Sequence, residues 1–279
     1  MDVAGIESHI HQSMSRLTSA EKRAARALLA NYPTIGLAPV VVFAREAGTS
    51  PATISRFVAQ LGFKSYPDLQ RALRDELEER VKSPLQRGLA KASSTSDAEH
   101  YLDGFFRQLG ANMEASAARI PASEFESAAA LLANLRTSLH ITGGRFTEAM
   151  ALYMEAHLRL VRPDVRRMDA RAAVRADQML DVRPGDVAIL FDVRRYDPQL
   201  LETAAQLSAR RAVMVLFTDE WISPASKYAR IVIPCRIAME RTWDANAALF
   251  AVVEALIARV TELAWPTASK RLDAIDWRL

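Results

Sequence analysis

The sequence predicts an α/β protein with an all-α N-terminal domain, and three observations lead to this prediction. Residues 38–62 indicate two short helices joined by a glycine-containing turn. Residues 83–96 combine a proline, a glycine and a serine-threonine cluster, which is typical of a linker. After them, short apolar runs alternate with helical patterns, as in a mostly parallel sheet flanked by helices. Because 279 residues exceed the usual single-domain size, we expect a helix-turn-helix domain over 1–82, a linker over 83–96 and an α/β domain over 97–279.

Two helices should precede the glycine turn. Thr18 and Glu21 are spaced as an N-cap and its reciprocal partner, so one helix should run from there to about Asn31. Pro39 suits the first turn of the next helix and Gly48 suits its end. The apolar residues of that helix recur on one face, which should pack on the core: Val42, Phe43 and Ala47.

The helix after the turn has signals at both ends. Ser50 is a good N-cap, Pro51 suits the first helical position, and Gly62 can adopt the left-handed conformation that ends a helix. Its apolar residues recur at helical spacing at Ile54, Phe57, Val58 and Leu61. The other positions should point outward: Ala52, Thr53, Ser55, Arg56 and Gln60.

Those outward side chains suit the major groove of DNA, because small residues allow close approach and Arg or Gln can then reach bases. We expect Thr53, Ser55 and Arg56 near bases, and Lys64, Tyr66 and the Ser50 cap region near phosphates. The complete predicted DNA-binding set is Ser50, Pro51, Ala52, Thr53, Ser55, Arg56, Gln60, Lys64 and Tyr66. The alternative is an ordinary solvated helix face.

The charge distribution favours a polyanionic partner. The whole chain has a net charge of only +3. Residues 14–74, however, hold nine Lys or Arg against three acidic residues, a local excess of six positive charges. A basic surface that merely faces solvent is the alternative.

Composition argues against several other classes. Cys235 is the one cysteine, which excludes an intrachain disulfide and a cysteine-based zinc site and fits a reducing compartment. The chain has no signal-peptide pattern and no apolar run near the ~20 residues that span a bilayer. His9 and His11 do not share a helix face, and no other usual ligand lies nearby. We expect a cytoplasmic protein with no metal, no cofactor and no membrane partner.

The rest of the chain alternates helices and strands. A charged helix should run from Asp68 to about Lys82, and two helical patterns cover residues 97–119 and 123–135. Four runs rich in β-branched residues predict strands over residues 138–142, 186–191, 212–217 and 231–233. Helical patterns over 146–161 and 198–209 separate these runs, which implies right-handed crossovers between parallel strands. An apolar helix over 244–263 follows and suits packing or a subunit interface.

Arranged in this way, the chain resembles the MurR/RpiR family of bacterial transcriptional regulators, which join an N-terminal helix-turn-helix domain to a sugar-isomerase (SIS) domain. The resemblance covers nearly the whole chain and is most specific at AREAGTSPATISRF, residues 44–57, and LGFKSYPDL, residues 61–69. It implies a homodimer or homotetramer that binds a double-stranded DNA operator with its N-terminal domains. It further implies that the C-terminal domains sense a small molecule, usually a phosphosugar.

The sensing half departs from the family pattern. Such domains bind phosphosugar at the carboxyl ends of parallel strands, where loops offer backbone N–H groups and hydroxyls. After the first strand, residues 142–147 are Thr-Gly-Gly-Arg-Phe-Thr, with Phe146 where the family favours a serine. After the next aligned strand, residues 192–197 are Asp-Val-Arg-Arg-Tyr-Asp in place of Ser-x-Ser-Gly-x-Thr. The expected ligand-binding residues are Gly143, Gly144, Arg145, Phe146, Thr147, Asp192, Arg194, Arg195, Tyr196, Asp219 and Ser223.

Three interpretations of these loops stay open. Asp192 and Asp197 would repel a phosphate while Arg194 and Arg195 could clamp an anion, which favours a pocket for some other anionic or polar metabolite. Alternatively, the carboxylates pair with Arg194, Arg195 or Arg145 in a closed polar network and no effector binds. The third is an unchanged phosphosugar pocket. Asp219 and Ser223 line the same crevice, or they are simply a turn residue and an N-cap.

An arginine-rich stretch lies in the C-terminal domain, interleaved with Asp164, Asp169 and Asp177. We interpret it as a solvated or interface surface rather than as an extension of the DNA-binding surface. Its members are Arg159, Arg162, Arg166, Arg167, Arg171 and Arg175.

These observations predict a sequence-specific transcriptional regulator of a metabolic operon, with no enzymatic activity and no catalytic residue. The alternative is an aldose-ketose phosphosugar isomerase with an accessory helical domain. Isomerisation needs a base near the substrate carbon and a bound phosphate, and the sequence singles out neither. A scaffold protein without either site is a further alternative, against which the intact second helix argues.

Overall fold

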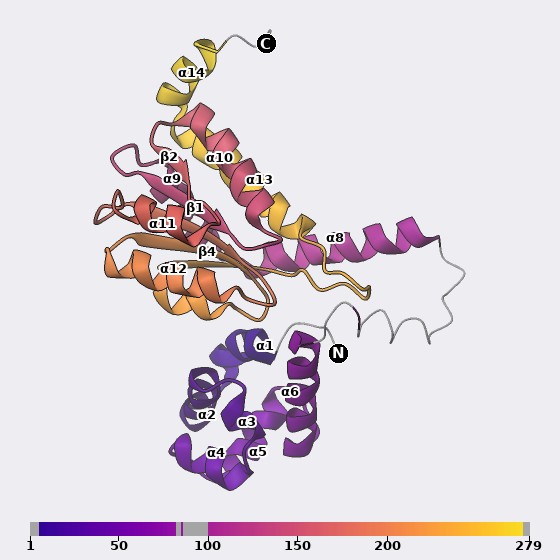
Figure 1. Cartoon of the computed structure of the whole chain (residues 1–279). Helices are drawn as coiled ribbons and strands as arrows, with labels where there is room; N and C mark the ends of the chain where they lie inside the picture. The colour runs from indigo at the N-terminus through magenta and orange to yellow at the C-terminus, as the bar shows by residue number, and fades with distance from the viewer. Residues whose placement is uncertain (1–5, 82–84, 86–99, 276–279) are drawn as a thin grey trace. The chain divides into compact units, whose positions relative to one another are not determined.

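The computed structural model describes residues 6–81, 85 and 100–275, and the chain divides into two compact units, Met1–Gln86 and Arg87–Leu279 (Figure 1). The predicted fold class is confirmed, since a helical unit precedes a unit built on a parallel sheet. The predicted linker over residues 83–96 lies, apart from residue 85, outside the described residues. None of the described helices is long and apolar enough to cross a membrane.

The N-terminal unit packs its helices around one apolar core. Its elements are α1 (Ile6–Ser13), the 3-10 turn η1 (Met14–Arg16), α2 (Ser19–Ala30), α3 (Thr34–Leu37), α4 (Val40–Glu46), α5 (Pro51–Gln60) and α6 (Tyr66–Val81). The rings of Phe43 and Phe57 pack edge to face with 6.5 Å between their centroids, and this contact joins α4 to α5. The largest fully buried side chains of this core are Ile10, Leu28, Phe43, Ile54, Phe57, Leu61, Leu69 and Leu73.

The local signals in the sequence act as predicted in this unit. Thr18 and Glu21 form a reciprocal capping box at the start of α2. Ser50 Oγ accepts a hydrogen bond from the backbone N–H of Thr53 at 3.3 Å and so caps α5. Gly48 and Gly62 have φ angles of +59° and +80°, the left-handed region that glycine tolerates best. Two helix boundaries differ slightly from the prediction. Pro39 is the N-cap of α4 and not a residue of its first turn, and α6 begins at Tyr66 and not at Asp68.

The C-terminal unit contains a five-stranded sheet in the order β2-β1-β3-β4-β5, with all four strand pairs parallel. Four of these strands were predicted, and β2 was missed. A three-residue edge strand of sequence Val-Arg-Arg is too short and too polar to carry an apolar period. The strands are β1 (Leu139–Gly143), β2 (Val165–Arg167), β3 (Val187–Asp192), β4 (Val213–Asp219) and β5 (Ile231–Cys235).

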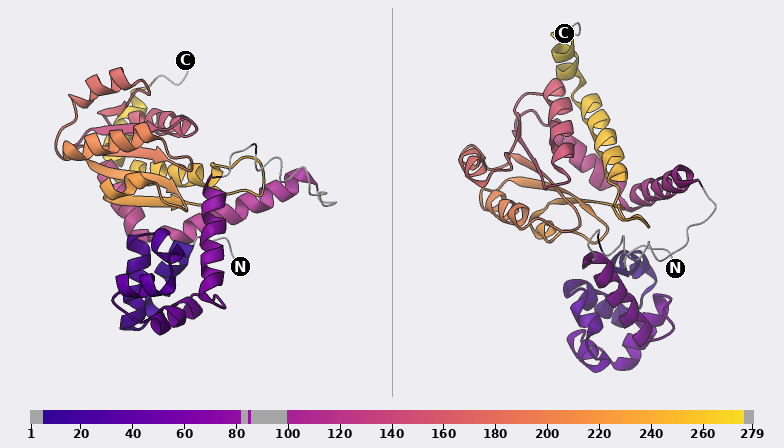
Figure 2. Two further views of the ribbon diagram at one scale, coloured as in Figure 1. Left: turned by 60° about the horizontal axis from the view of Figure 1, so that its bottom comes forward. Right: turned by 45° about the vertical axis from the view of Figure 1, so that its right-hand side comes forward.

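Helices cover both faces of the sheet (Figures 1 and 2). Ile189 and Phe191 face an apolar cluster with α9, α10, α13 and α14, whereas Ala188 and Leu190 face a second cluster with α11 and α12. The sequence did not predict α11 or α14. The helical elements are α8 (Tyr101–Arg119), α9 (Ala122–Ala133), α10 (Glu148–Val161), α11 (Ala172–Met179), α12 (Pro198–Ala209), the 3-10 turn η2 (Pro224–Tyr228), α13 (Ala247–Leu263) and α14 (Trp265–Asp273).

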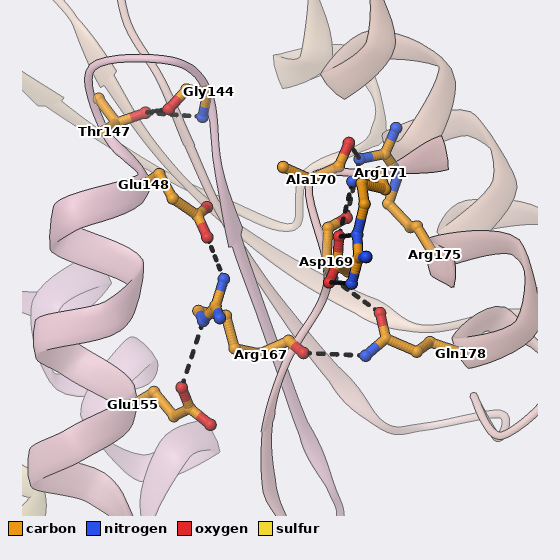
Figure 3. Close-up of polar contacts among 10 residues, drawn as sticks. All are labelled: Gly144, Thr147, Glu148, Glu155, Arg167, Asp169, Ala170, Arg171, Arg175 and Gln178. Carbon is orange, nitrogen blue, oxygen red and sulfur yellow. Dashed lines mark hydrogen bonds and ion pairs between the residues drawn. The ribbon is translucent and has the colours of Figure 1, made fainter. Parts of the chain in front are cut away.

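The arginine-rich stretch is only partly a surface, which corrects the expectation. Arg162 is fully buried, and its guanidinium donates to the carbonyls of Leu132, Thr137 and Pro163. Arg175 is also buried, and it donates to the carbonyls of Asp169 and Ala170. The others pair with carboxylates, as Figure 3 shows for Arg167 with Glu148 and Glu155 and for Arg171 with Asp169. Two arginines of this stretch therefore hold the fold together.

Replacing Arg162 with leucine should lower the free energy of unfolding by at least about 3 kcal/mol. The substitution removes three hydrogen bonds from a charged donor and leaves their carbonyl acceptors beside an apolar side chain. Urea unfolding of the full chain measures the change. Arg159→Leu is the matched control because the Arg159 side chain is 67% exposed, and equal losses in the two variants would contradict this role of Arg162.

Candidate DNA interface and ligand site

The α5 helix presents a polar face to solvent. Between Gly48 and Gly62, small residues at the start of α5 leave its backbone open to close approach by a partner. The exposed members of the predicted DNA-binding set are Ser50, Pro51, Ala52, Ser55, Arg56, Gln60 and Lys64.

Two members of the predicted set do not point outward. Thr53 is 5% exposed, and its hydroxyl lies 3.0 Å from that of Ser50. The Tyr66 hydroxyl donates to the carbonyls of Gly36 at 3.0 Å and Ala38 at 2.8 Å, and burial raises the pKa of Tyr66 to about 12. Both side chains therefore make contacts within the domain.

Arg56 is exposed but already oriented. Its Nη2 donates to Thr53 Oγ1 at 3.3 Å. The pKa of Glu21 is lowered, first by hydrogen bonds from Thr18 and also by the charge of Arg56. Arg56 is therefore positioned between the exposed face of α5 and the start of α2.

In the C-terminal unit, three loops follow neighbouring parallel strands and meet at the carboxyl edge of the sheet. The loop after β1 is tight, since a Cβ atom on Gly143 would lie 2.6 Å from the carbonyl carbon of Thr147. Thr147 Oγ1 donates to the carbonyl of Phe191 at 2.6 Å and accepts from the N–H of Gly144 at 2.8 Å. The hydroxyl of this loop is thus used within the chain.

Asp192 ends β3 and is 2% exposed. Its carboxylate accepts from the Ser223 hydroxyl and, at 3.2 Å, from the N–H of Asp197. Burial raises the pKa of Asp192 to about 6, although both hydrogen bonds act in the opposite direction. The pairings with Arg194, Arg195 or Arg145 that the sequence suggested for this carboxylate do not form.

Asp219 ends β4 and is completely buried. Its carboxylate accepts hydrogen bonds from the backbone N–H of Arg194, from the Tyr196 hydroxyl at 2.8 Å and from the backbone N–H of Trp221 at 3.0 Å. Burial nevertheless raises its pKa. The Arg194 guanidinium forms an ion pair with the Asp244 carboxylate and lies 4.1 Å from the centroid of the Trp221 ring. The loop after β5 is thereby tied to the loop after β3.

Backbone strain accompanies this network. Arg195 has a φ of +70° and Ile222 a φ of +57°, and positive φ is a true outlier for a β-branched residue. Such conformations persist where surrounding contacts determine them and often mark functional sites. Both residues lie in the loops that hold Asp192 and Asp219.

Two exposed aromatic rings and a basic side chain lie beside these loops. Phe146 is 49% exposed and Trp243 57% exposed, and their rings meet edge to face at 6.0 Å between centroids. The Arg145 guanidinium lies 5.3 Å from the centroid of Phe146. Sequence patterns missed Trp221, in the loop after β4, and Trp243 and Asp244, in the loop after β5, because neither loop has a periodic pattern that would relate it to β3. No group of three or more metal-ligating side chains occurs among the residues that the structure describes.

Comparisons with known proteins identify both units. Residues 4–80 match the model of the helix-turn-helix domain of the rpiR family, and residues 131–259 match the SIS domain model. No curated protein sequence matches the chain.

Two solved structures are similar in fold. The sugar isomerase domain of an RpiR transcription factor from Sphaerobacter thermophilus aligns with a TM-score of 0.56 and 20% identity, over 64% of this chain and 98% of that one. The Vibrio vulnificus NanR protein, solved in complex with ManNAc-6P, aligns with a TM-score of 0.54 and 15% identity, over 96% of this chain and 95% of that one.

The buried Asp192 predicts a specific pH dependence. Its pKa is about 6 in the folded chain and about 3.9 in an unfolded one. Below pH about 4 Asp192 is protonated in both the folded and the unfolded chain. As the pH rises from there through about 6, the unfolded chain loses this proton first, so the free energy of unfolding falls by up to about 3 kcal/mol. Because asparagine does not titrate, the free energy of unfolding of the Asp192→Asn variant should rise relative to that of the wild type over this pH range. Urea unfolding between pH 4 and pH 7.5 measures the difference.

Asp164→Asn is the matched control, since Asp164 is exposed and its left-handed φ of +56° suits asparagine. Parallel pH profiles for the wild type and Asp192→Asn would refute the raised pKa.

Proposed function

We propose that this chain, which belongs to the RpiR family of helix-turn-helix proteins with a C-terminal SIS domain, regulates the transcription of a metabolic operon. The domain composition makes it a DNA-binding transcriptional regulator. The observation that carries the proposed mode of binding is the exposed polar face of α5, on which Arg56 and Gln60 flank small residues. Ala52, Ser55, Arg56 and Gln60 would approach bases, and the Ser50 region and Lys64 would approach phosphates.

A dimer would match two such helices to a palindromic operator. The surface that favours dimerisation lies on α8, whose N-terminal half extends beyond the sheet (Figures 1 and 2). Tyr101, Leu102 and Phe106 are 66%, 52% and 60% exposed, and Met113 lies a further two turns along the face of Phe106. Large apolar side chains of this kind in a row suit a second copy of the same helix.

The carboxyl edge of the sheet is the proposed effector site. Ligands of open α/β sheets bind at this edge, and the NanR protein that shares the fold was solved in complex with ManNAc-6P. An effector bound among the three loops would shift the spacing of the two DNA-binding domains and so alter operator affinity. Its contacts would come from the predicted residues that remain exposed or half-buried, namely Gly143, Gly144, Arg145, Phe146, Arg195 and Tyr196.

Catalysis of aldose-ketose isomerisation is less well supported. Asp192 and Asp219 each accept hydrogen bonds from within the chain. Glu220 would be the best base, since burial raises its pKa to about 7, but it is only 3% exposed. Because a general base must reach the substrate, the burial of the Glu220 carboxylate favours a binding domain over an enzyme. A cytoplasmic location, where the operator is, stays a prediction.

Arg56→Ala should weaken operator binding by about 1–3 kcal/mol and relax the base preference at one position of each half-site. Lys64→Ala should weaken binding to all sequences alike and reduce the salt slope by about one. Fluorescence anisotropy with operator DNA at several salt concentrations measures both effects. Arg159→Ala, which removes the same charge from the other unit, is the control, and an unchanged sequence profile for Arg56→Ala would overturn the assignment.

Phe106→Asp should shift the chain from dimer to monomer, with a dissociation constant at least about tenfold higher, because a carboxylate would be buried against an apolar surface. Sedimentation velocity measures the shift. Leu180→Asp is the control, since Leu180 is 80% exposed at the C-cap of α11, away from α8 in the sequence. A dimer unaffected by Phe106→Asp would place the interface elsewhere.

A further inference from the structure

We propose that a hollow at the amino edge of the sheet binds the phosphate group of a small molecule that also carries hydroxyl groups. This site is separate from the effector site proposed at the opposite, carboxyl edge. The hollow lies where β1, β2 and β3 begin, and its volume is about 330 Å³. Small-molecule sites in proteins usually exceed about 300 Å³. Three arginines from three chain segments line it: Arg136, Arg166 and Arg183.

Two buried charged residues hold the walls of this hollow together. Arg162 is fully buried, and its guanidinium donates to carbonyl groups shortly before β1 and shortly before β2. Asp186 is 5% exposed, and its carboxylate accepts from the backbone N–H groups of Ser138 and Arg183, each at 2.9 Å. The segments that lead into the three strands are therefore fixed relative to one another before a ligand arrives.

The guanidinium groups of Arg136 and Arg183 are available to a ligand. Both residues are exposed, and neither guanidinium makes a hydrogen bond or an ion pair with any residue that the structure describes. Arg166 pairs with Asp181 at 3.3 Å, but these side chains are 49% and 70% exposed, and exposed pairs contribute little free energy. Since neighbouring strands lie about 4.8 Å apart, guanidinium groups from adjacent strands can reach one anion.

The acidic residues of the hollow do not cancel its positive charge. The charges of Asp186 and the buried Arg162 act on each other, so this pair adds no net charge. Arg211 adds an exposed arginine beside the hollow, because its carbonyl accepts from the N–H of Gly185 at 3.0 Å. Apart from the buried pair, the arginines in or next to the hollow exceed the aspartates by two charges. They are Arg136, Arg166, Arg183 and Arg211 against Asp164 and Asp181.

A phosphate group suits this arrangement better than a single carboxylate does. It carries about two negative charges near pH 7, which matches the local excess. Guanidinium groups bind phosphate oxygens with two parallel N–H donors each. The hydroxyl of Ser138, which also lines the hollow, can donate to a further oxygen. The carboxylate of Asp164 would accept from a hydroxyl of the same ligand, which is why the ligand carries hydroxyl groups beside its phosphate.

Protection of arginines against phenylglyoxal tests where a phosphate binds. This reagent modifies accessible guanidinium groups, and mass spectrometry of peptides from the full chain reports each position. We expect glycerol 3-phosphate and inorganic phosphate to protect Arg136 and Arg183. Sodium chloride at equal ionic strength should not protect them, and Arg159, whose side chain is 67% exposed, should stay reactive throughout.

Two results of this mapping would overturn the proposal. Protection of Arg145 and Arg195 alone would assign the phosphate to the carboxyl edge. Protection of Arg136 and Arg183 by a DNA duplex of unrelated sequence, but by neither small probe, would assign them to a polyanion. The absence of any protection would also contradict the site.

Paired variants measure the affinity by isothermal titration with glycerol 3-phosphate. Arg136→Gln with Arg183→Gln removes the two available guanidinium groups and should weaken binding at least about tenfold, because charge-assisted hydrogen bonds are lost. Arg159→Gln with Arg171→Gln is the matched control, since it removes the same charge from side chains of the same unit that are 67% and 76% exposed. Equal losses in the two double variants would reduce the effect to net charge and overturn the proposal.

Discussion

A charged group buried beside a parallel sheet must find its partners within the chain, and the C-terminal unit depends on this constraint at several places. Arg162 satisfies it by joining the end of α10 to carbonyls at the end of α9 and just before β1. Asp219 and Arg194 satisfy it at the carboxyl edge, with Asp244 supplied from the loop after β5. Because an unpartnered buried charge costs several kcal/mol, these contacts determine how the loops and helices lie against the sheet.

The two units expose polar groups to very different extents. On α5 the side chains that face solvent are small or long and flexible, and they are available to a large polyanion. At the carboxyl edge of the sheet, by contrast, the carboxylates and hydroxyls bind groups of the chain itself, and aromatic rings and arginine side chains are exposed. The polar side chains of α5 are therefore directed to solvent, whereas those at the carboxyl edge of the sheet are held within the chain.

The parts that the sequence predicted well are those set by local signals. The capping box of Thr18, the Ser50 cap and the glycines at positive φ lie next to the helix ends that they determine. Strands β1, β3, β4 and β5 are buried runs of β-branched residues, whereas β2 is a short polar edge. Thr53 was expected to point outward but is 5% exposed, and α5 packs against both α2 and α4. The pair of Arg194 and Asp244 spans 50 residues, and no local pattern connects them.

The central claim is that the exposed face of α5 recognises specific DNA as part of a dimer. Genome-wide capture of the DNA fragments bound by the full chain tests this claim most directly, because it does not depend on a chosen operator. The account predicts a small number of discrete sites that share an inverted repeat with half-sites about one helical turn apart. Diffuse binding along the genome, without a shared motif, would contradict it.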